Sequence, residues 1–257
     1  MTPPGPDLAA PPPCWRCGLP ADPVGGACPH CRARLGPPAP AKPSDRPHPL
    51  LGVITAYAVM LTASLVWGWV VHFSDGLGES GRLVGTAVLE GFDTALVLIT
   101  ALAIGRVSVP RPARRVRAAA WVTAPVALAA VLATNVAYRA VLAAYLRPGW
   151  APEPAAEPGW SALTVVLCCV QPAVVEEWFF RYLALGAVRT AAGTHAAVWV
   201  SAVMFALAHV YNPLGLPWLL LAGVVFGYWR VAGGGLALPI LMHFAHNAVI
   251  LGVEGFA

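Results

Sequence analysis

Charged side chains are scarce in this chain of 257 residues: Asp, Glu, Lys and Arg make up only 11%, whereas hydrophobic residues make up 58%. Soluble domains average about 25% charged residues. This scarcity excludes an ordinary soluble domain and predicts a polytopic membrane protein. A signal peptide is also missing from the pattern, because the first apolar run begins only at Leu50, after a polar, Pro-rich segment.

Seven apolar segments are long enough, or nearly long enough, to cross a bilayer, which takes about 20 helical residues. They are 50–71, 83–105, 118–146, 161–188, 195–210, 216–231 and 236–253. All seven are expected to be helices, since only helices and closed barrels satisfy their backbone in lipid and the runs are too continuously apolar for barrel strands. The fifth and sixth are short, so each is tilted, re-entrant or buried, and the count is uncertain by one. The expected fold is an all-α bundle.

Arginines set the expected orientation of this bundle, because cytoplasmic loops carry an excess of Lys and Arg. Five of them cluster between Arg106 and Arg117. This cluster places the loop after the second span, and with it the N-terminus, on the cytoplasmic side of a multi-pass protein of the cell membrane. The net charge of +4 then reflects topology, and no nucleic-acid partner is expected.

Two CxxC pairs precede the first span. They consist of Cys14 and Cys17, and of Cys28 and Cys31. Their spacing is typical of a zinc ribbon, in which four thiolates hold a structural zinc ion. Disulfides or idle thiols are the alternatives, and a cytoplasmic location disfavours disulfides. We expect a zinc-ribbon module over 1–36, whose partner the sequence does not reveal, a Pro-rich linker over 37–49, and the N-terminal transmembrane helices over 50–146.

Three charges interrupt the fourth apolar segment. Each of Glu176, Glu177 and Arg181 costs roughly 2.5–3.5 kcal/mol near the centre of a bilayer. Glu177 and Arg181 are four residues apart, share a helix face and can form an ion pair. Glu176 is rotated about 100° from Glu177 on a regular helix and lacks such a cation. One carboxylate is therefore expected to be structural and the other to be available for chemistry.

Later apolar segments add the polar side chains His209, His243 and Asn247. The last two are again four residues apart and share a face. His246 faces another direction and is of secondary interest. A single histidine on an apolar helix is usually a packing residue, but three such patterns on successive helices indicate a functional site.

The ordered set of EExxxR from Glu176 to Arg181, FxxxH ending at His209 and HxxxN ending at Asn247 resembles the CPBP family of intramembrane proteases. That family includes CAAX prenyl endopeptidases and bacteriocin-processing and immunity proteins. The resemblance covers roughly 161–253, and it implies a CPBP-type catalytic transmembrane region over 147–257.

The resemblance implies roles for these residues in an intramembrane endopeptidase. Glu176 and His209 would activate a water, His243 and Asn247 would stabilise the oxyanion, and the Glu177–Arg181 pair would hold the site together or orient substrate. A carboxylate and imidazoles suit this chemistry. The family is often labelled metalloprotease, and one Glu with two His could bind zinc. We expect catalysis by glutamate without a tightly held metal. The substrate would be a membrane-associated peptide or protein, prenylated or not.

Two other functions stay open at this point. One is a non-catalytic membrane protein of the binding or immunity type, although the complete motif set argues against lost activity. The other is a transporter or proton relay, because intramembrane Glu and His residues also serve that role. Glu90, Asp93 and Arg139 in earlier spans keep it open, or pair with one another across helices. The absence of an internal repeat disfavours it.

Overall fold

The computed structural model describes residues 21, 27–29, 49–74, 78–105, 107, 112–145, 161–210 and 213–254. By its contacts the chain divides into two compact units, Met1–Asp45 and Arg46–Ala257. Three of the four expected zinc ligands, Cys14, Cys17 and Cys31, lie outside the described residues, while Cys28 is described and buried. The zinc ribbon and the cytoplasmic N-terminus stay predictions.

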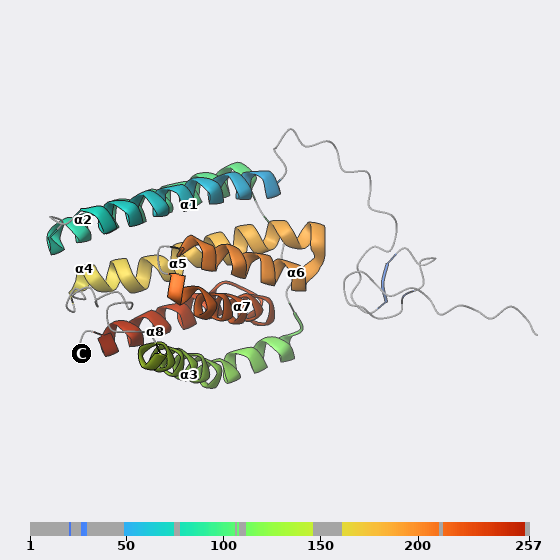
Figure 1. The fold of residues 1–257 in the computed structure, drawn as a ribbon. Helices are drawn as coiled ribbons and strands as arrows, with labels where there is room; N and C mark the ends of the chain where they lie inside the picture. Colours follow the sequence, from blue (N-terminus) through green and yellow to red (C-terminus); the bar gives the residue numbers. More distant parts are fainter. Residues whose placement is uncertain are drawn as a thin grey trace, which may run out of the picture. The chain divides into compact units, whose positions relative to one another are not determined.

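The second unit is helical, as the composition predicted (Figure 1). Its first half contains α1 (Pro49–Phe73), α2 (Glu79–Ile104) and α3 (Arg114–Tyr145). Its second half contains α4 (Ala162–Val165), η2 (Val166–Val170), α5 (Gln171–Glu176), η3 (Glu177–Ala184), α6 (Leu185–Ala208), η4 (Pro213–Gly215), α7 (Leu216–Gly233) and α8 (Ala237–Glu254). Within the described residues, five helices are long and apolar enough to cross a membrane, and Ala237–Gly252 is a shorter apolar helix.

One of these five is the continuous stretch Ala162–Ala208, which contains the fourth and fifth predicted segments. The helix is broken inside α6 at Gly193, whose φ of 81° and ψ of 175° are not helical. Glycine adopts such a backbone at no steric cost. The chain reverses near this point, so that the second arm of α6 runs back beside the first (Figure 1).

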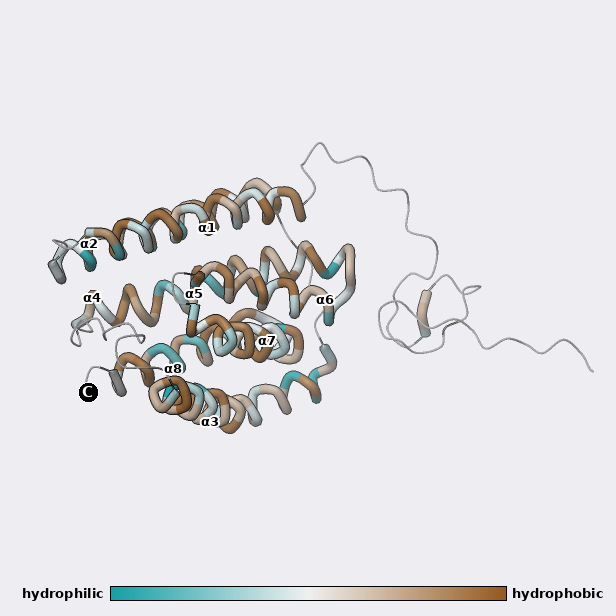
Figure 2. The backbone as a smooth tube through the Cα atoms, in the orientation of Figure 1, coloured by the Kyte–Doolittle hydropathy of each residue, from teal (hydrophilic) through white to brown (hydrophobic). Residues whose placement is uncertain are grey.

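Hydrophobic residues occur along all the long helices (Figure 2), and the helices differ in how many of their residues are buried. In the membrane-length windows of α1, α2 and α3, only 22%, 17% and 11% of the residues are buried, against 39% for Ala162–Ala208. Large apolar side chains such as Leu102 and Val122 are exposed on these first helices. The first three helices thus leave most of their residues unburied and open to lipid, whereas the spans in Ala162–Ala208 and Pro213–Gly233 are more deeply packed.

Two glycines bring α7 against the second arm of α6. A Cβ atom added at Gly223 would lie 3.0 Å from the Cα and Cβ atoms of Ala202, and one added at Gly227 would lie 2.9 Å from the side chain of Val198. Small residues four apart allow helix backbones to approach closely in membranes, where van der Waals packing drives association. This approach positions the backbone of α7 next to the buried Arg181.

We predict that Gly223→Val destabilises the protein, because the new side chain would overlap the backbone of Ala202, and overpacking costs typically 1–3 kcal/mol. Gly91→Val on α2 is the matched control, since a Cβ there meets nothing within 4 Å. Thermal unfolding in detergent should show a lower midpoint for Gly223→Val alone. Equal midpoints for the two variants would contradict this account of the α6–α7 contact.

Candidate active site

The two glutamates lie where the helix changes its winding. Glu176 is the last residue of α5, and Glu177 begins the π-helical segment η3. Such π-helical turns are rare and are often found at functional sites. The side chain of Glu177 is fully buried, whereas that of Glu176 is 23% exposed. The structure therefore separates a core carboxylate from an accessible one.

Glu177 forms the predicted ion pair with Arg181. Its Oε2 lies 3.3 Å from Nε of Arg181, and both side chains have no exposed surface. The guanidinium lies 4.4 Å from the ring centroid of Phe205, and its Nη2 donates to the carbonyl of Gly223 at 3.5 Å. The pair thus joins η3 to α6 and α7. A cation–π contact of this kind is strongest when desolvated, as it is here.

His243 on α8 lies between the two glutamates. Its Nδ1 lies 3.0 Å from Oε1 of Glu177, and its Nε2 lies 3.9 Å from Oε2 of Glu176. A regular helix points adjacent residues about 100° apart, yet these two carboxylates reach opposite nitrogens of one imidazole. Because a carboxylate paired with a guanidinium accepts hydrogen bonds, Nδ1 of His243 is assigned as the donor in this bond. Glu176 is thereby linked to the buried pair through His243.

His209 approaches Glu176 from the end of α6. Its Nε2 lies 3.8 Å from Oε1 of Glu176, and its Nδ1 lies 3.0 Å from the carbonyl oxygen of Phe205. A carbonyl oxygen only accepts, so Nδ1 is the donor, and in the neutral ring Nε2 then presents a lone pair. The two oxygens of Glu176 therefore face two imidazole nitrogens that come from different helices.

Asn247, one turn beyond His243 on α8, makes other contacts. Its Nδ2 donates to the carbonyl of Cys168 in η2 at 3.0 Å, and its Oδ1 accepts from Nδ1 of His246 at 3.1 Å. His246 stacks on Trp218, with ring centroids 5.8 Å apart. The structure thus brings together Glu176, His209 and His243. The main contact of Asn247 is its hydrogen bond to η2, which holds α8 against that segment.

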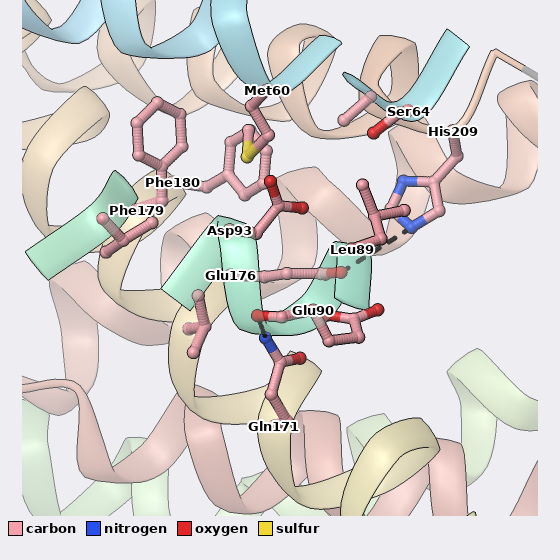
Figure 3. A pocket seen from close by; sticks show the side chains of 13 residues that line it. Met60, Ser64, Leu89, Glu90, Asp93, Gln171, Glu176, Phe179, Phe180 and His209 are labelled. Carbon is pink, nitrogen blue, oxygen red and sulfur yellow. Dashed lines mark hydrogen bonds and ion pairs between the residues drawn. The ribbon is translucent and has the colours of Figure 1, made fainter. Parts of the chain in front are cut away.

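A cavity of about 60 Å³ adjoins the Glu176–His209 contact. This is room for a few water molecules. Its polar lining comes from three parts of the chain, as the close view shows (Figure 3): Ser64 on α1, Glu90 and Asp93 on α2, and Gln171, Glu176 and His209 from 171–209.

From the sequence, Glu90 and Asp93 were expected either to serve a transporter or proton relay or to pair with one another or with Arg139, and Gln171 was overlooked. The signal that could have found all three is a polar residue inside an apolar span, although such a pattern does not show which spans are neighbours.

A catalytic zinc would have Glu176, His209 and His243 as its candidate ligands. One carboxylate and two imidazoles are a suitable donor set, and both rings have the Nδ1 partner that ligating histidines usually have. Among the residues that the structure describes, however, no group of three or more His, Cys, Asp or Glu side chains is arranged to hold a metal ion. In this arrangement Glu176, His209 and His243 are therefore not placed as the ligands of one metal ion.

We predict that Glu177→Ala lowers the stability of the protein more than Glu176→Ala does. Removing Glu177 strands the buried Arg181, and breaking a buried ion pair typically costs about 3–5 kcal/mol. Glu176 is partly exposed and has no such partner within hydrogen-bond distance. Thermal unfolding in detergent measures the difference. Equal or reversed losses would mean that the structural and accessible roles of the two glutamates are exchanged.

Comparison with known proteins agrees with the motif pattern. The family model of the type II CAAX prenyl endopeptidases, described as Rce1-like, matches residues 158–249. No curated protein and no solved structure matches the chain. The match includes every residue of the EExxxR, FxxxH and HxxxN patterns and leaves out α1, α2 and α3. Residues 158–249 of this multi-pass membrane protein are thus similar to the Rce1-like CAAX prenyl endopeptidases, and this match supports the CPBP membership that the motifs predicted.

Proposed function

We propose that this protein is an intramembrane endopeptidase of the CAAX-protease type, which hydrolyses a peptide bond with a water activated by Glu176 and His209. The observation that carries the proposal is the convergence of His209 Nε2 and His243 Nε2 on the two oxygens of Glu176, at 3.8 and 3.9 Å, beside a cavity with room for water. These distances are too long for direct hydrogen bonds. The adjoining cavity is the space for the reacting water.

A water beside Glu176 and His209 satisfies both groups. The carboxylate accepts one of its protons, and Nε2 of His209, which presents a lone pair while Nδ1 donates to the Phe205 carbonyl, accepts the other. Both hydrogen bonds draw electron density toward the water oxygen. The water is thus oriented and made more nucleophilic in a site where low polarity strengthens each interaction.

Hydrolysis then proceeds with Glu176 as the proton carrier. The water oxygen bonds to the peptide carbonyl carbon while Glu176 takes one water proton. Glu176 returns that proton to the amide nitrogen as the carbon–nitrogen bond breaks. The products are an amine and a carboxylic acid, whose remaining proton passes to the amine. Water and one peptide bond are consumed, so the step needs no other reactant.

The oxyanion is stabilised from α8. Nδ1 of His243 donates a hydrogen bond to Glu177, and a proton on its Nε2, beside Glu176, would be the donor that faces the oxyanion. Asn247 has two amide protons, of which one is bonded to Cys168, and the second completes the oxyanion contacts. Glu177 and Arg181 act through His243, because they hold its ring in place.

We predict that Glu176→Gln abolishes proteolysis, with a loss of about 10²–10⁴-fold, the usual contribution of a general acid–base group. His209→Ala should lose activity as well, whereas His72→Ala, an exposed histidine on α1, is the matched control and should not. Substrate-trapping proteomics that compares the intact protein with Glu176→Ala would supply substrates for this assay. Cleavage by Glu176→Gln at the wild-type rate would refute the proposal.

One observation supports a second candidate function. Glu90, Asp93, Glu176 and His209 line one cavity, an arrangement that also suits a proton relay. Proton flux into liposomes that contain the purified protein separates the two functions. Flux that Asp93→Asn abolishes, together with no detectable proteolysis, would favour the relay.

The ribbon is proposed to hold one structural zinc through Cys14, Cys17, Cys28 and Cys31, separately from catalysis. We therefore predict that a truncated protein that begins at Pro49 keeps its proteolytic activity and is insensitive to chelators, while a chelator removes one zinc from the full chain. Metal analysis and activity assays check both statements. Loss of activity in the truncated protein on chelation, with recovery on adding zinc, would instead make Glu176, His209 and His243 zinc ligands.

A further inference from the structure

The amide group of Gln171 has a defined orientation in the wall of the cavity. Its Nε2 donates to the backbone carbonyl of Glu90 at 3.0 Å and to Oγ1 of Thr94 at 3.1 Å. The Thr94 hydroxyl gives its own proton to the Glu90 carbonyl at 2.7 Å, so it can only accept from Gln171. Both Gln171 protons are therefore used on α2, and the amide cannot be flipped (Figure 3).

Two buried oxygens of residues that line the cavity have no hydrogen-bond partner among the described residues. They are Oε1 of Gln171 and Oδ1 of Asp93, and both side chains line the cavity together with Glu176. A buried acceptor left unsatisfied costs about 1–3 kcal/mol. Such groups are few in native proteins, and each requires an explanation. Beside a proposed catalytic base, these two acceptors are placed to receive a donor from whatever fills the cavity, whether water or a group of the substrate.

The donors that suit these two oxygens are backbone N–H groups, which every peptide substrate carries. A peptide bond is open to attack where the substrate is not in a regular helix, and the backbone N–H groups freed there lose their acceptors within the helix. Acceptors in the protein must take their place. Oε1 of Gln171 only accepts, and Oδ1 of Asp93 accepts when it carries no proton, as this role requires.

We propose that Gln171 and Asp93 are substrate-positioning residues that accept hydrogen bonds from backbone N–H groups of the unwound substrate segment next to the scissile bond. The proposal rests on the peptidase function of Glu176. It makes α2, which lies outside the family match, a part of the substrate site. The same Gln171 amide that binds the substrate with its oxygen holds α2 in place with its nitrogen.

Ester analogues of a substrate test this directly, because an ester oxygen replaces one N–H and changes little else. The probe is the best-cleaved internally quenched peptide from a library, together with analogues that carry one ester at successive positions. Full-length protein, Asp93→Leu and Gln171→Leu are compared. Thr100→Val, a conservative change on α2 away from the cavity lining, is the matched control. Thr94→Val loosens the clamp but keeps Oε1 of Gln171.

We expect an ester at one or two positions to lower kcat/KM of the wild type and of Thr100→Val by about tenfold. Asp93→Leu should cleave the parent peptide about tenfold more slowly than the wild type does. In this variant, one of these esters should lower kcat/KM by less than twofold relative to the parent peptide. Gln171→Leu should likewise show less than a twofold drop in kcat/KM for one of these esters. Thr94→Val should show the same drop as the wild type. A structural role alone would leave the ester effects unchanged, since uncoupled changes add. Full ester sensitivity in both leucine variants overturns the proposal.

Failure of the peptidase function gives a different result. In that case the wild type cleaves no library peptide faster than Glu176→Gln does. Binding then decides the positioning role: fluorescence anisotropy compares the amide and ester forms of a labelled Leu-rich library peptide on Glu176→Gln. The role of Asp93 is supported if an ester form binds more weakly than the amide form and if this difference disappears when Asp93→Leu is added. Equal binding of all forms refutes it.

Discussion

The burial of one ion pair in an apolar helix is the constraint on which the remaining structure depends. Glu177 and Arg181 have no exposed surface, and each would be costly alone at membrane depth. Their pairing removes part of that cost, and the aromatic ring of Phe205 and the carbonyl of Gly223 remove more. Elements that pack around this pair must therefore approach closely, which explains the glycines of α7.

The same pair organises the chemistry. Glu177 uses one oxygen for Arg181 and the other for Nδ1 of His243. The imidazole is thereby fixed, and its other nitrogen faces Glu176. Glu176, which is partly exposed and has no cation of its own, is thus linked through the fixed His243 ring to the charged Glu177–Arg181 pair. Preorganised groups of this kind are the main source of electrostatic stabilisation in enzymes.

Much of the fold followed from the chain's pattern of apolar runs, since seven such segments correspond to the helices observed. Two features did not follow. The π-helical turn at Glu177 depends on side-chain packing with neighbouring helices, which no local pattern encodes. The merging of the fourth and fifth segments into one stretch turned at Gly193 depends on a single backbone conformation, and a glycine in an apolar run does not reveal whether it will be used in this way.

By itself, the sequence determined the class of the protein, the pairing of Glu177 with Arg181 and the protease family that residues 158–249 resemble, because hydrophobicity and helix spacing act over a few neighbouring residues. Only the tertiary structure decided which distant side chains meet. It brought His209 and His243 to different oxygens of Glu176. The Asn247 amide donates a hydrogen bond to the carbonyl of Cys168, and Gln171 and Asp93 line the cavity. These contacts join helices that are far apart in the chain, and packing between whole helices selects them.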